Sequence, residues 1–210
     1  MSLFDVYPLY DVTPIKAQDV WVYDAAPTKY LDLYGGHAVI SIGHAHPKYV
    51  ENLTKQLGDI GFYSNAVKNP LQEALGEKLP LQANCPGYQL FMCSSGAEAN
   101  ENALKMASFV TGRKKVVAFH NSFHGRTSAA VAATDNPKII APINAQQEVE
   151  FLPLGDLDAL AAVLAKGDVC AVIVEFIQGV GGLDISTAEF YEGVDKLCKE
   201  TGTCLIADEV

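Results

Sequence analysis

The segment Val169–Glu175 restricts the fold of this chain more than any other stretch. Its residues from Cys170 to Val174 are apolar one after another, without the alternation of a strand that has one solvent-exposed face. A strand of this kind is buried on both faces, as in a parallel sheet that helices cover on both sides. The sequence therefore predicts an α/β protein, built as an α-β-α sandwich with a mostly parallel sheet.

The chain after residue 88 has the pattern of such a sandwich, because short apolar segments alternate with segments of helical periodicity. The predicted strands are residues 89–92, 115–119, 148–152, 169–175 and 204–207. The predicted helices are residues 97–110, 126–133, 157–165 and 188–200. In the first of these helices, one apolar stripe is expected to face the core, formed by Ala99, Ala103, Met106, Ala107 and Val110.

The segment before residue 89 has a different pattern. Residues 20–24 and 29–33 alternate like a small antiparallel hairpin around a turn at 25–28. Helices are predicted at 47–57, with Gly58 as the stop, and at 70–79. His44 and His46 have no cysteine or carboxylate close in sequence, so we interpret them as structural residues rather than metal ligands.

The net charge is −10, from 15 basic and 25 acidic residues, which disfavours nucleic acid or an acidic membrane surface as a partner. No apolar stretch is long enough to span a bilayer, and residues 1–8 lack the pattern of a signal peptide. The five cysteines are odd in number and share no metal-like spacing. We therefore expect a cytoplasmic protein with small, reduced, buried thiols.

Two interpretations fit the turn between the predicted strand 89–92 and the helix that follows it. The first N–H groups of a helix have no internal partner and favour an anion, and Gly96 lets the backbone approach a phosphate closely. Ser94 or Ser95 can add a hydroxyl donor. Alternatively, Ser95 is an N-cap and Glu98 completes a capping box. Both interpretations remain open from these residues alone.

Polar residues also follow the other predicted strands at corresponding ends, where open α/β sheets bind ligands. Phe123 and Arg126 follow the second strand, Glu175 ends the fourth, and Asp208 follows the last. Each has an ordinary alternative, such as core packing for Phe123 or a helix cap for Asp208. Their joint occurrence at one sheet edge predicts a ligand site.

Four motifs occur in the order and spacing of the class III aminotransferases, which are pyridoxal-phosphate enzymes of fold type I. The motifs are Ser95-Gly-Ala-Glu-Ala-Asn-Glu, Phe123-His-Gly-Arg-Thr, Glu175-Phe-Ile-Gln-Gly-Val-Gly-Gly and Ala207-Asp-Glu-Val. The resemblance is greatest to the acetylornithine and succinylornithine aminotransferases. It implies that residues 1–46 form an N-terminal segment with part of the small domain and substrate loop, and that residues 47–210 form an incomplete cofactor-binding large domain. The C-terminal small domain and the Schiff-base lysine are expected beyond residue 210.

The resemblance also implies roles in binding pyridoxal 5'-phosphate. Ser95, Gly96 and Ala97 would hold its phosphate, and Phe123 would stack on its ring. Asp208 would pair with the ring nitrogen as a catalytic residue, and its negative charge would keep that nitrogen protonated.

Further implied roles concern the substrate. Glu175 would support the cofactor side of the site as a second catalytic residue, Arg126 would bind a substrate carboxylate, and Tyr63 would reach the substrate. Phe176 and Val180 depart from the family pattern Glu-Pro-Ile-Gln-Gly-Glu, and this departure bears on the identity of the amino donor.

The function that the resemblance implies is amino transfer from N-acetylornithine or N-succinylornithine to 2-oxoglutarate by a homodimer in arginine metabolism. Other class III activities remain alternatives, namely ornithine or 4-aminobutyrate aminotransferase, aminomutase and decarboxylase. A nucleotide-binding α/β protein or a non-catalytic phosphate-binding fragment are alternatives from other classes. The absence of Gly-x-Gly-x-x-Gly and of a Gly-Lys-Ser/Thr loop disfavours the nucleotide-binding protein.

Overall fold

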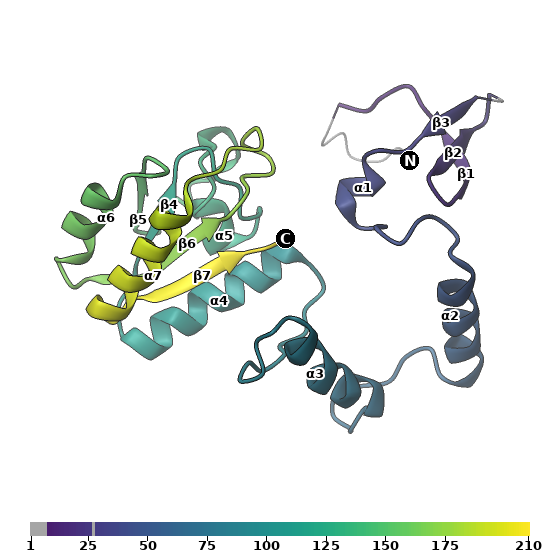
Figure 1. Ribbon diagram of the computed structural model, residues 1–210, viewed down its shortest axis with the longest axis horizontal. Coiled ribbons are helices and arrows are strands. Elements are labelled where there is room, and N and C mark those ends of the chain that lie inside the picture. The colour runs from purple at the N-terminus through teal and green to yellow at the C-terminus, as the bar shows by residue number, and fades with distance from the viewer. Residues whose placement is uncertain (1–7, 27) are drawn as a thin grey trace. The chain divides into compact units, whose positions relative to one another are not determined.

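The computed structural model describes residues 8–26 and 28–210, so the first seven residues and Pro27 of the predicted turn lie outside the described part. The chain forms two compact units, one up to Ala83 and one from Asn84 onward (Figure 1). This division falls later in the chain than the boundary expected after residue 46. The assignment of residues 1–46 and 47–210 to parts of a larger enzyme stays a prediction.

The first unit begins with a three-stranded antiparallel sheet of order β1-β2-β3. Its strands are β1 (Pro14–Gln18), β2 (Trp21–Asp24) and β3 (Lys29–Leu31). The predicted hairpin is therefore confirmed, and β1 adds a strand that was not predicted. His44 Nε2 lies 2.7 Å from Asp32 Oδ2, a carboxylate that is distant in sequence. The residues described include no cluster of metal-ligating side chains.

Helices make up the remainder of the first unit: α1 (Gly35–Ala38), α2 (Pro47–Asp59) and α3 (Pro70–Gln82). The expected stop at Gly58 is wrong, because the backbone N–H of Ile60 still donates to Gln56 O and continues the helix past the glycine. The prediction also ended α3 too early, since this helix passes through Pro80.

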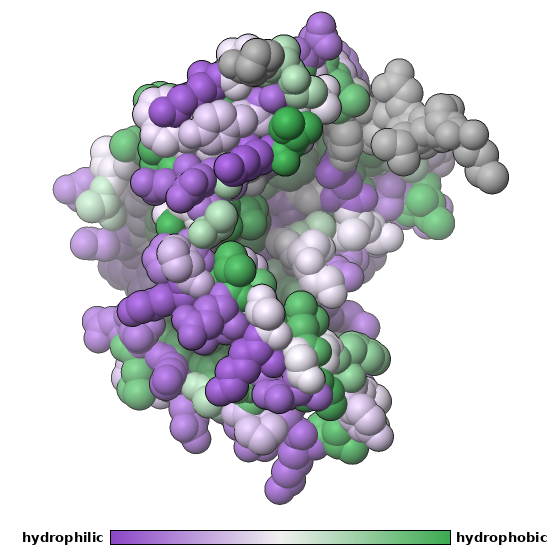
Figure 2. Space-filling model, turned by 90° about the vertical axis from the view of Figure 1, so that its right-hand side faces the viewer, coloured by the Kyte–Doolittle hydropathy of each residue, from purple (hydrophilic) through white to green (hydrophobic). Residues whose placement is uncertain are grey.

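The described part of the first unit has no hydrophobic core of its own. Pro80 is its only buried residue, whereas Leu33, Leu57 and Phe62 are 90%, 68% and 87% exposed. Figure 2 likewise shows green apolar residues at the surface among purple polar ones. The amphipathic pattern of this unit therefore does not lead to burial within the unit itself.

The second unit is a three-layer sandwich around a parallel four-stranded sheet of order β5-β4-β6-β7, which confirms the predicted architecture (Figure 1). Every residue of β6 is buried, as expected for its apolar run, and the burial extends to Glu175 at its end. The strands are β4 (Lys115–Phe119), β5 (Val149–Leu152), β6 (Val169–Glu175) and β7 (Cys204–Asp208).

Helices cover both faces of this sheet. On one face, Leu104 and Ala107 of α4 (Gly96–Thr111) pack with Ala118 and Ile173, and α5 (Ser128–Ala132) lies beside α4. On the other face, α6 (Leu157–Leu164) and α7 (Ala188–Thr201) cover Phe119 and other apolar side chains. A short 3-10 helix, η1 (Pro137–Ile139), follows α5. No helix among the residues described is both long and apolar enough to cross a membrane.

The strand predicted at residues 89–92 is not formed. A strand needs a hydrogen-bonded neighbour, and no strand in the described part of the chain pairs with this segment. Phe91 and Met92 are 63% and 51% exposed, so burial does not hold the segment in place either. Apolar composition identified a possible strand but did not supply its partner.

The buried face of α4 also differs from the predicted apolar stripe. Met106 and Val110 are 60% and 77% exposed, whereas the buried residues are Asn100, Leu104 and Ala107. These three follow the same helical spacing, but the stripe begins with a polar residue, so an apolar pattern alone could not find it.

The thiols were expected to be buried, and this is correct only in part. All five cysteines are free; Cys170 and Cys198 are buried, whereas Cys93 is exposed. Burial raises the pKa of the Cys198 thiol to about 12. Cys198 is therefore an inert core residue at neutral pH.

Candidate active site

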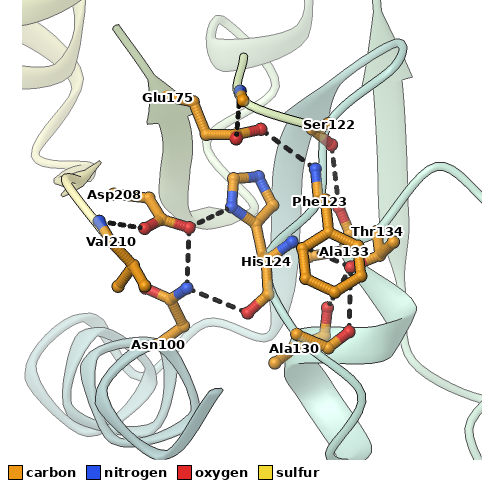
Figure 3. A network of polar contacts seen from close by, with 12 residues as sticks. Asn100, Ser122, Phe123, His124, Ala130, Ala133, Thr134, Glu175, Asp208 and Val210 are labelled. Carbon is orange, nitrogen blue, oxygen red and sulfur yellow. Dashed lines mark hydrogen bonds and ion pairs between the residues drawn. The ribbon is translucent and has the colours of Figure 1, made fainter. Parts of the chain in front are cut away.

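The parallel register of the sheet places two carboxylates side by side. Glu175 at the end of β6 is the register partner of Asp208 at the end of β7. The loop that follows β4 reaches the same edge and carries Phe123 and His124 (Figure 3). Residues that are distant in sequence therefore meet at one sheet edge because parallel strands end there together.

Asp208 is buried and accepts three hydrogen bonds. Asn100 Nδ2 and His124 Nδ1 each lie 2.8 Å from its Oδ2, and the backbone N–H of Val210 donates to its Oδ1 at 3.0 Å. Burial by itself raises the pKa of this carboxyl, but the hydrogen bonds from His124, Val210 and Asn100 outweigh it, and the pKa is lowered. Asp208 is therefore a buried, ionised carboxylate at neutral pH.

Glu175 joins two loops through its carboxyl group. Its Oε2 accepts from the backbone N–H of Phe123 at 2.9 Å, and its Oε1 accepts from the N–H of Gly179 at 3.2 Å. Burial raises the pKa of Glu175. The hydrogen bonds from Phe123 and Gly179 and the neighbouring His124 oppose this rise, and the nearby charge of Asp208 adds a smaller contribution to it. The two neighbouring carboxyls are thus shifted in opposite directions, which is typical of a functional site.

The N-terminus of α4 forms a variant of the predicted capping box, in which Glu98 accepts from the residue before the N-cap Ser95. Ser95 Oγ accepts from the N–H of Glu98 at 3.2 Å, and Glu98 Oε2 accepts from the N–H of Ser94 at 2.7 Å. Among the residues described, none accepts a hydrogen bond from the N–H groups of Gly96 and Ala97. The cap therefore leaves two backbone donors at the positive end of the helix dipole, and both interpretations of this turn are compatible.

The loop after β4 packs directly on the first turn of α4. A Cβ atom added to Gly125 would lie 2.7 Å from Ala97 Cβ and 2.9 Å from Ala97 Cα, and Gly125 has a φ of +129°. Glu101 Oε2 accepts from Thr127 Oγ1 at 2.8 Å and from the N–H of Ala130 at 3.0 Å, so α4 also caps α5. This close approach fixes the helix N-terminus against the loop that carries Phe123.

Replacing Gly125 by alanine is expected to destabilise the full-length protein by about 2 kcal/mol or more, since both the backbone conformation and the contact with Ala97 oppose a side chain. The matched control is Gly167→Ala, because Gly167 has a φ of +74° with nothing within 4 Å of an added Cβ. Urea unfolding of both variants checks the prediction. Equal losses of unfolding free energy would show that the contact with Ala97 contributes nothing.

The other predicted site residues have different surroundings. Phe123, which Figure 3 labels, is half-buried according to its exposed surface, and Arg126 is exposed in the loop before α5. The helix predicted from residue 126 starts only at Ser128, because Thr127 occupies its N-cap position. Tyr63 is 67% exposed and belongs to the first unit, between α2 and α3. Its proposed contact with a substrate stays a prediction.

Two residues of the site were not selected from the sequence. Asn100 bridges His124 O, at 2.9 Å, and Asp208, and His124 is a direct neighbour of Asp208. Both belong to motifs already recognised, Ser95-Gly-Ala-Glu-Ala-Asn-Glu and Phe123-His-Gly-Arg-Thr. A polar residue at a core-facing helical position was the signal that could have identified Asn100.

The fold and this site define an α/β protein that can hold an anionic group at a helix N-terminus and a cationic nitrogen at a buried carboxylate. The model of the aminotransferase class III family matches residues 6–210. The chain belongs to this family, and the family assignment makes it part of a pyridoxal-phosphate-dependent transaminase of fold type I.

Individual relatives agree with this assignment. Acetylornithine aminotransferase of Bacillus amyloliquefaciens is 40% identical over 210 residues, which cover 100% of this chain and 91% of that protein. Acetylornithine aminotransferase of Bacillus subtilis is also 40% identical, but this chain covers only 54% of it. The chain thus spans about half the length of the Bacillus subtilis relative.

Solved structures show the same fold. The ornithine aminotransferase from Toxoplasma gondii ME49 aligns with a TM-score of 0.89 at 24% identity, over 98% of this chain and 50% of that chain. A β-phenylalanine aminotransferase from Variovorax paradoxus aligns with a TM-score of 0.81 at 23% identity, over 96% of this chain and 45% of that chain.

Proposed function

We propose that the complete protein is a pyridoxal-phosphate-dependent aminotransferase that moves an amino group from N-acetylornithine, or N-succinylornithine, to 2-oxoglutarate in arginine metabolism. The observation that carries the proposal is the buried, ionised Asp208 beside a helix N-terminus with two available donors, in a chain 40% identical to acetylornithine aminotransferases. We further propose a cytoplasmic homodimer that binds neither nucleic acid nor membranes.

The donor set at the sheet edge fits pyridoxal 5'-phosphate. The N–H groups of Gly96 and Ala97, with the Ser95 hydroxyl, would bind the phosphate. Phe123 would stack on the ring, and Asp208 would accept a hydrogen bond from the protonated ring nitrogen. The bound cofactor supplies an electron sink for the carbon of the donor that loses its proton.

The roles of the remaining residues are to orient and to bind. Asp208 keeps its negative charge because three donors stabilise the carboxylate, and it would thereby hold a proton on the ring nitrogen. Glu175 holds the backbone N–H of Phe123 and so would fix the stacking residue. Exposed Arg126 would bind a substrate carboxylate as a planar fork, and Tyr63 would contact the substrate.

The amino donor is the feature on which a second candidate function depends. Val180, at the position of the second glutamate in the family pattern, is 71% exposed. Phe176, at the position of the proline, packs against Tyr191 with the two ring centroids 4.7 Å apart. Its backbone carbonyl also accepts a hydrogen bond from Tyr191 Oη. These substitutions favour a second candidate, another class III activity with a different amino donor.

A panel of amino donors tests the choice. With full-length protein, N-acetylornithine or N-succinylornithine should give a kcat/KM about tenfold or more above ornithine and 4-aminobutyrate, a ratio within what a substrate pocket can achieve. Glutamate formed from 2-oxoglutarate is the readout. Faster turnover of ornithine or 4-aminobutyrate would replace the first candidate by the second, and absence of glutamate with every donor would contradict both.

A further inference from the structure

The carboxylate of Glu101 on α4 caps α5, the helix that follows the next strand. Its Oε2 accepts hydrogen bonds from Thr127 Oγ1 at 2.8 Å and from the N–H groups of Ala129 and Ala130 at 2.9 Å and 3.0 Å, and its Oε1 accepts from the same Ala129 N–H at 3.0 Å. Thr127 occupies the N-cap position of α5, yet its hydroxyl donates to Glu101 instead of accepting from α5. A side chain of α4 therefore closes the N-terminus of α5 and fixes it in place.

The chain is attached to α4 on the other side of exposed Arg126 as well. Gly125 packs so closely on α4 that an added Cβ would lie 2.7 Å from Ala97 Cβ. Ala97 and Glu101 are at positions i and i+4 of α4, so they lie on one face of this helix, about one turn apart. The segment from Gly125 to Ala130 follows this face, and Arg126 lies between its two attachments.

The first turn of α4 also carries the two donors that we propose bind a phosphate, the N–H groups of Gly96 and Ala97. One helix is therefore a common support for these donors and for the backbone around Arg126. A guanidinium binds a carboxylate as a directed planar fork, and a long side chain reaches a fixed place only if its backbone is held. Removing the Glu101 carboxylate would release the chain after Arg126 and leave the donors of the first turn where they are.

We propose that Glu101 is a positioning residue that fixes Arg126 relative to the N-terminus of α4, and thereby makes the protein selective for amino donors and acceptors with a carboxylate at a set distance from the reacting group. Glu101 itself does not touch the substrate in this arrangement. The selectivity rests on the proposed function, in which Arg126 binds that carboxylate, whereas the attachment of α5 to α4 does not.

The first test measures the attachment by amide hydrogen exchange in cofactor-free, full-length protein. In Glu101→Ala, the amides of Ala129 and Ala130 should exchange about tenfold or more faster, the scale of one lost charge-assisted hydrogen bond. In Glu101→Gln, exchange should stay within about threefold of the wild-type rate, because the amide oxygen can still accept from both N–H groups. Unchanged exchange in Glu101→Ala would overturn the proposal. Should this variant fail to fold, Glu101→Asp takes its place, because its shorter side chain keeps the charge but reaches less far.

The second test separates KM from kcat in the loaded, full-length protein. Glu101→Ala should raise the KM for 2-oxoglutarate about tenfold and lower kcat by about threefold or less, because a displaced Arg126 weakens binding of the carboxylate more than it alters the reacting bonds. Glu101→Gln should bring KM back to within about threefold of the wild-type value. A loss of kcat with an unchanged KM would contradict the proposal.

Asp156→Ala is the matched control, because Asp156 is also a carboxylate that caps a helix. Its Oδ1 accepts from the N–H of Ala159 at 2.8 Å at the start of α6, which covers the opposite face of the sheet from α4. This variant should lose thermal stability, as Glu101→Ala does, but keep the wild-type KM for 2-oxoglutarate. An equal rise of KM in both variants would indicate a general effect of lost stability and would contradict the proposal.

A double-mutant cycle then tests whether Glu101 acts through Arg126. Glu101→Ala should raise the KM for 2-oxoglutarate about tenfold in the wild-type background but about twofold or less in Arg126→Ala. Additive increases would show independent roles and would contradict the proposal. If Arg126→Ala alone leaves KM unchanged, the inferred selectivity fails. If the full-length protein shows no cofactor absorbance with added pyridoxal 5'-phosphate, the proposed function fails, while hydrogen exchange still decides the attachment.

Discussion

Replacing Asp208 by asparagine is expected to lower kcat of the full-length protein by about two orders of magnitude or more, the scale of a removed electrostatic stabiliser in an active site. Asparagine keeps the shape of the side chain but removes the negative charge, so a bound ring nitrogen would lose the group that holds its proton. The amide also cannot accept from Asn100, His124 and Val210 as the carboxylate does. Binding of the cofactor should remain measurable, because the α4 N-terminus and Phe123 are untouched.

The measurement combines steady-state kinetics with the absorbance spectrum of the bound cofactor. Asp195→Asn is a suitable control, because the carboxylate of Asp195 pairs with Lys199 in an exposed i,i+4 ion pair on α7 rather than with a residue of the site. Its kcat should match the wild-type value, since exposed ion pairs contribute little. A wild-type rate in Asp208→Asn would remove Asp208 from the proposed mechanism, whatever the control shows.

Replacing Gly96 by valine is expected to weaken cofactor binding by about tenfold or more, comparable to the loss of one or two charge-assisted hydrogen bonds. A Cβ atom at this position would lie 2.6 Å from Val210 Cγ1, so the first turn of α4 or the end of the chain after β7 must move. The first movement displaces the N–H groups of Gly96 and Ala97 from the anion that we propose they bind, and the second disturbs the hydrogen bond from the Val210 N–H to Asp208.

Equilibrium titration of cofactor-free, full-length protein with pyridoxal 5'-phosphate measures this effect, and thermal unfolding reports any loss of stability. Gly76→Val is the matched control, because Gly76 also lies in a helix, α3, and nothing lies within 4 Å of an added Cβ. The control should bind cofactor with unchanged affinity. Undiminished affinity in Gly96→Val would mean that the phosphate is held elsewhere.

The sequence identified the strand ends but not the contacts between them. Glu175 and Asp208 were each predicted to lie at the end of a strand, but sequence alone does not say that they are register partners. Register depends on how neighbouring strands align in the sheet, which is a long-range property. The hydrogen bond from His124 to Asp208 joins residues 84 positions apart and follows from that alignment.

The predictions that failed have a related cause. The segment 89–92 has the composition of a strand, but strands need partners from elsewhere in the chain. The stripe predicted for α4 was chosen by hydropathy, whereas the helix buries Asn100 because His124 O and Asp208 satisfy its amide. A hydropathy scale assigns a free-energy cost to burying a polar side chain. It cannot include the hydrogen-bond partners that offset this cost, because only the fold brings them close.

By itself the sequence determined the sandwich architecture, the two-sided burial of β6, the helix N-terminus at Gly96 and the motifs of the class III family. These depend on periodicity, local backbone chemistry and residue identity, which are local properties. Only the tertiary structure decided that Asn100 and His124 surround Asp208 and that Glu175 lies on the other side of the imidazole (Figure 3). It also leaves His124 Nε2 without a hydrogen-bond partner among the residues described. The physical reason is that buried charges and hydrogen bonds depend on distances between groups far apart in the chain, and folding alone fixes those distances.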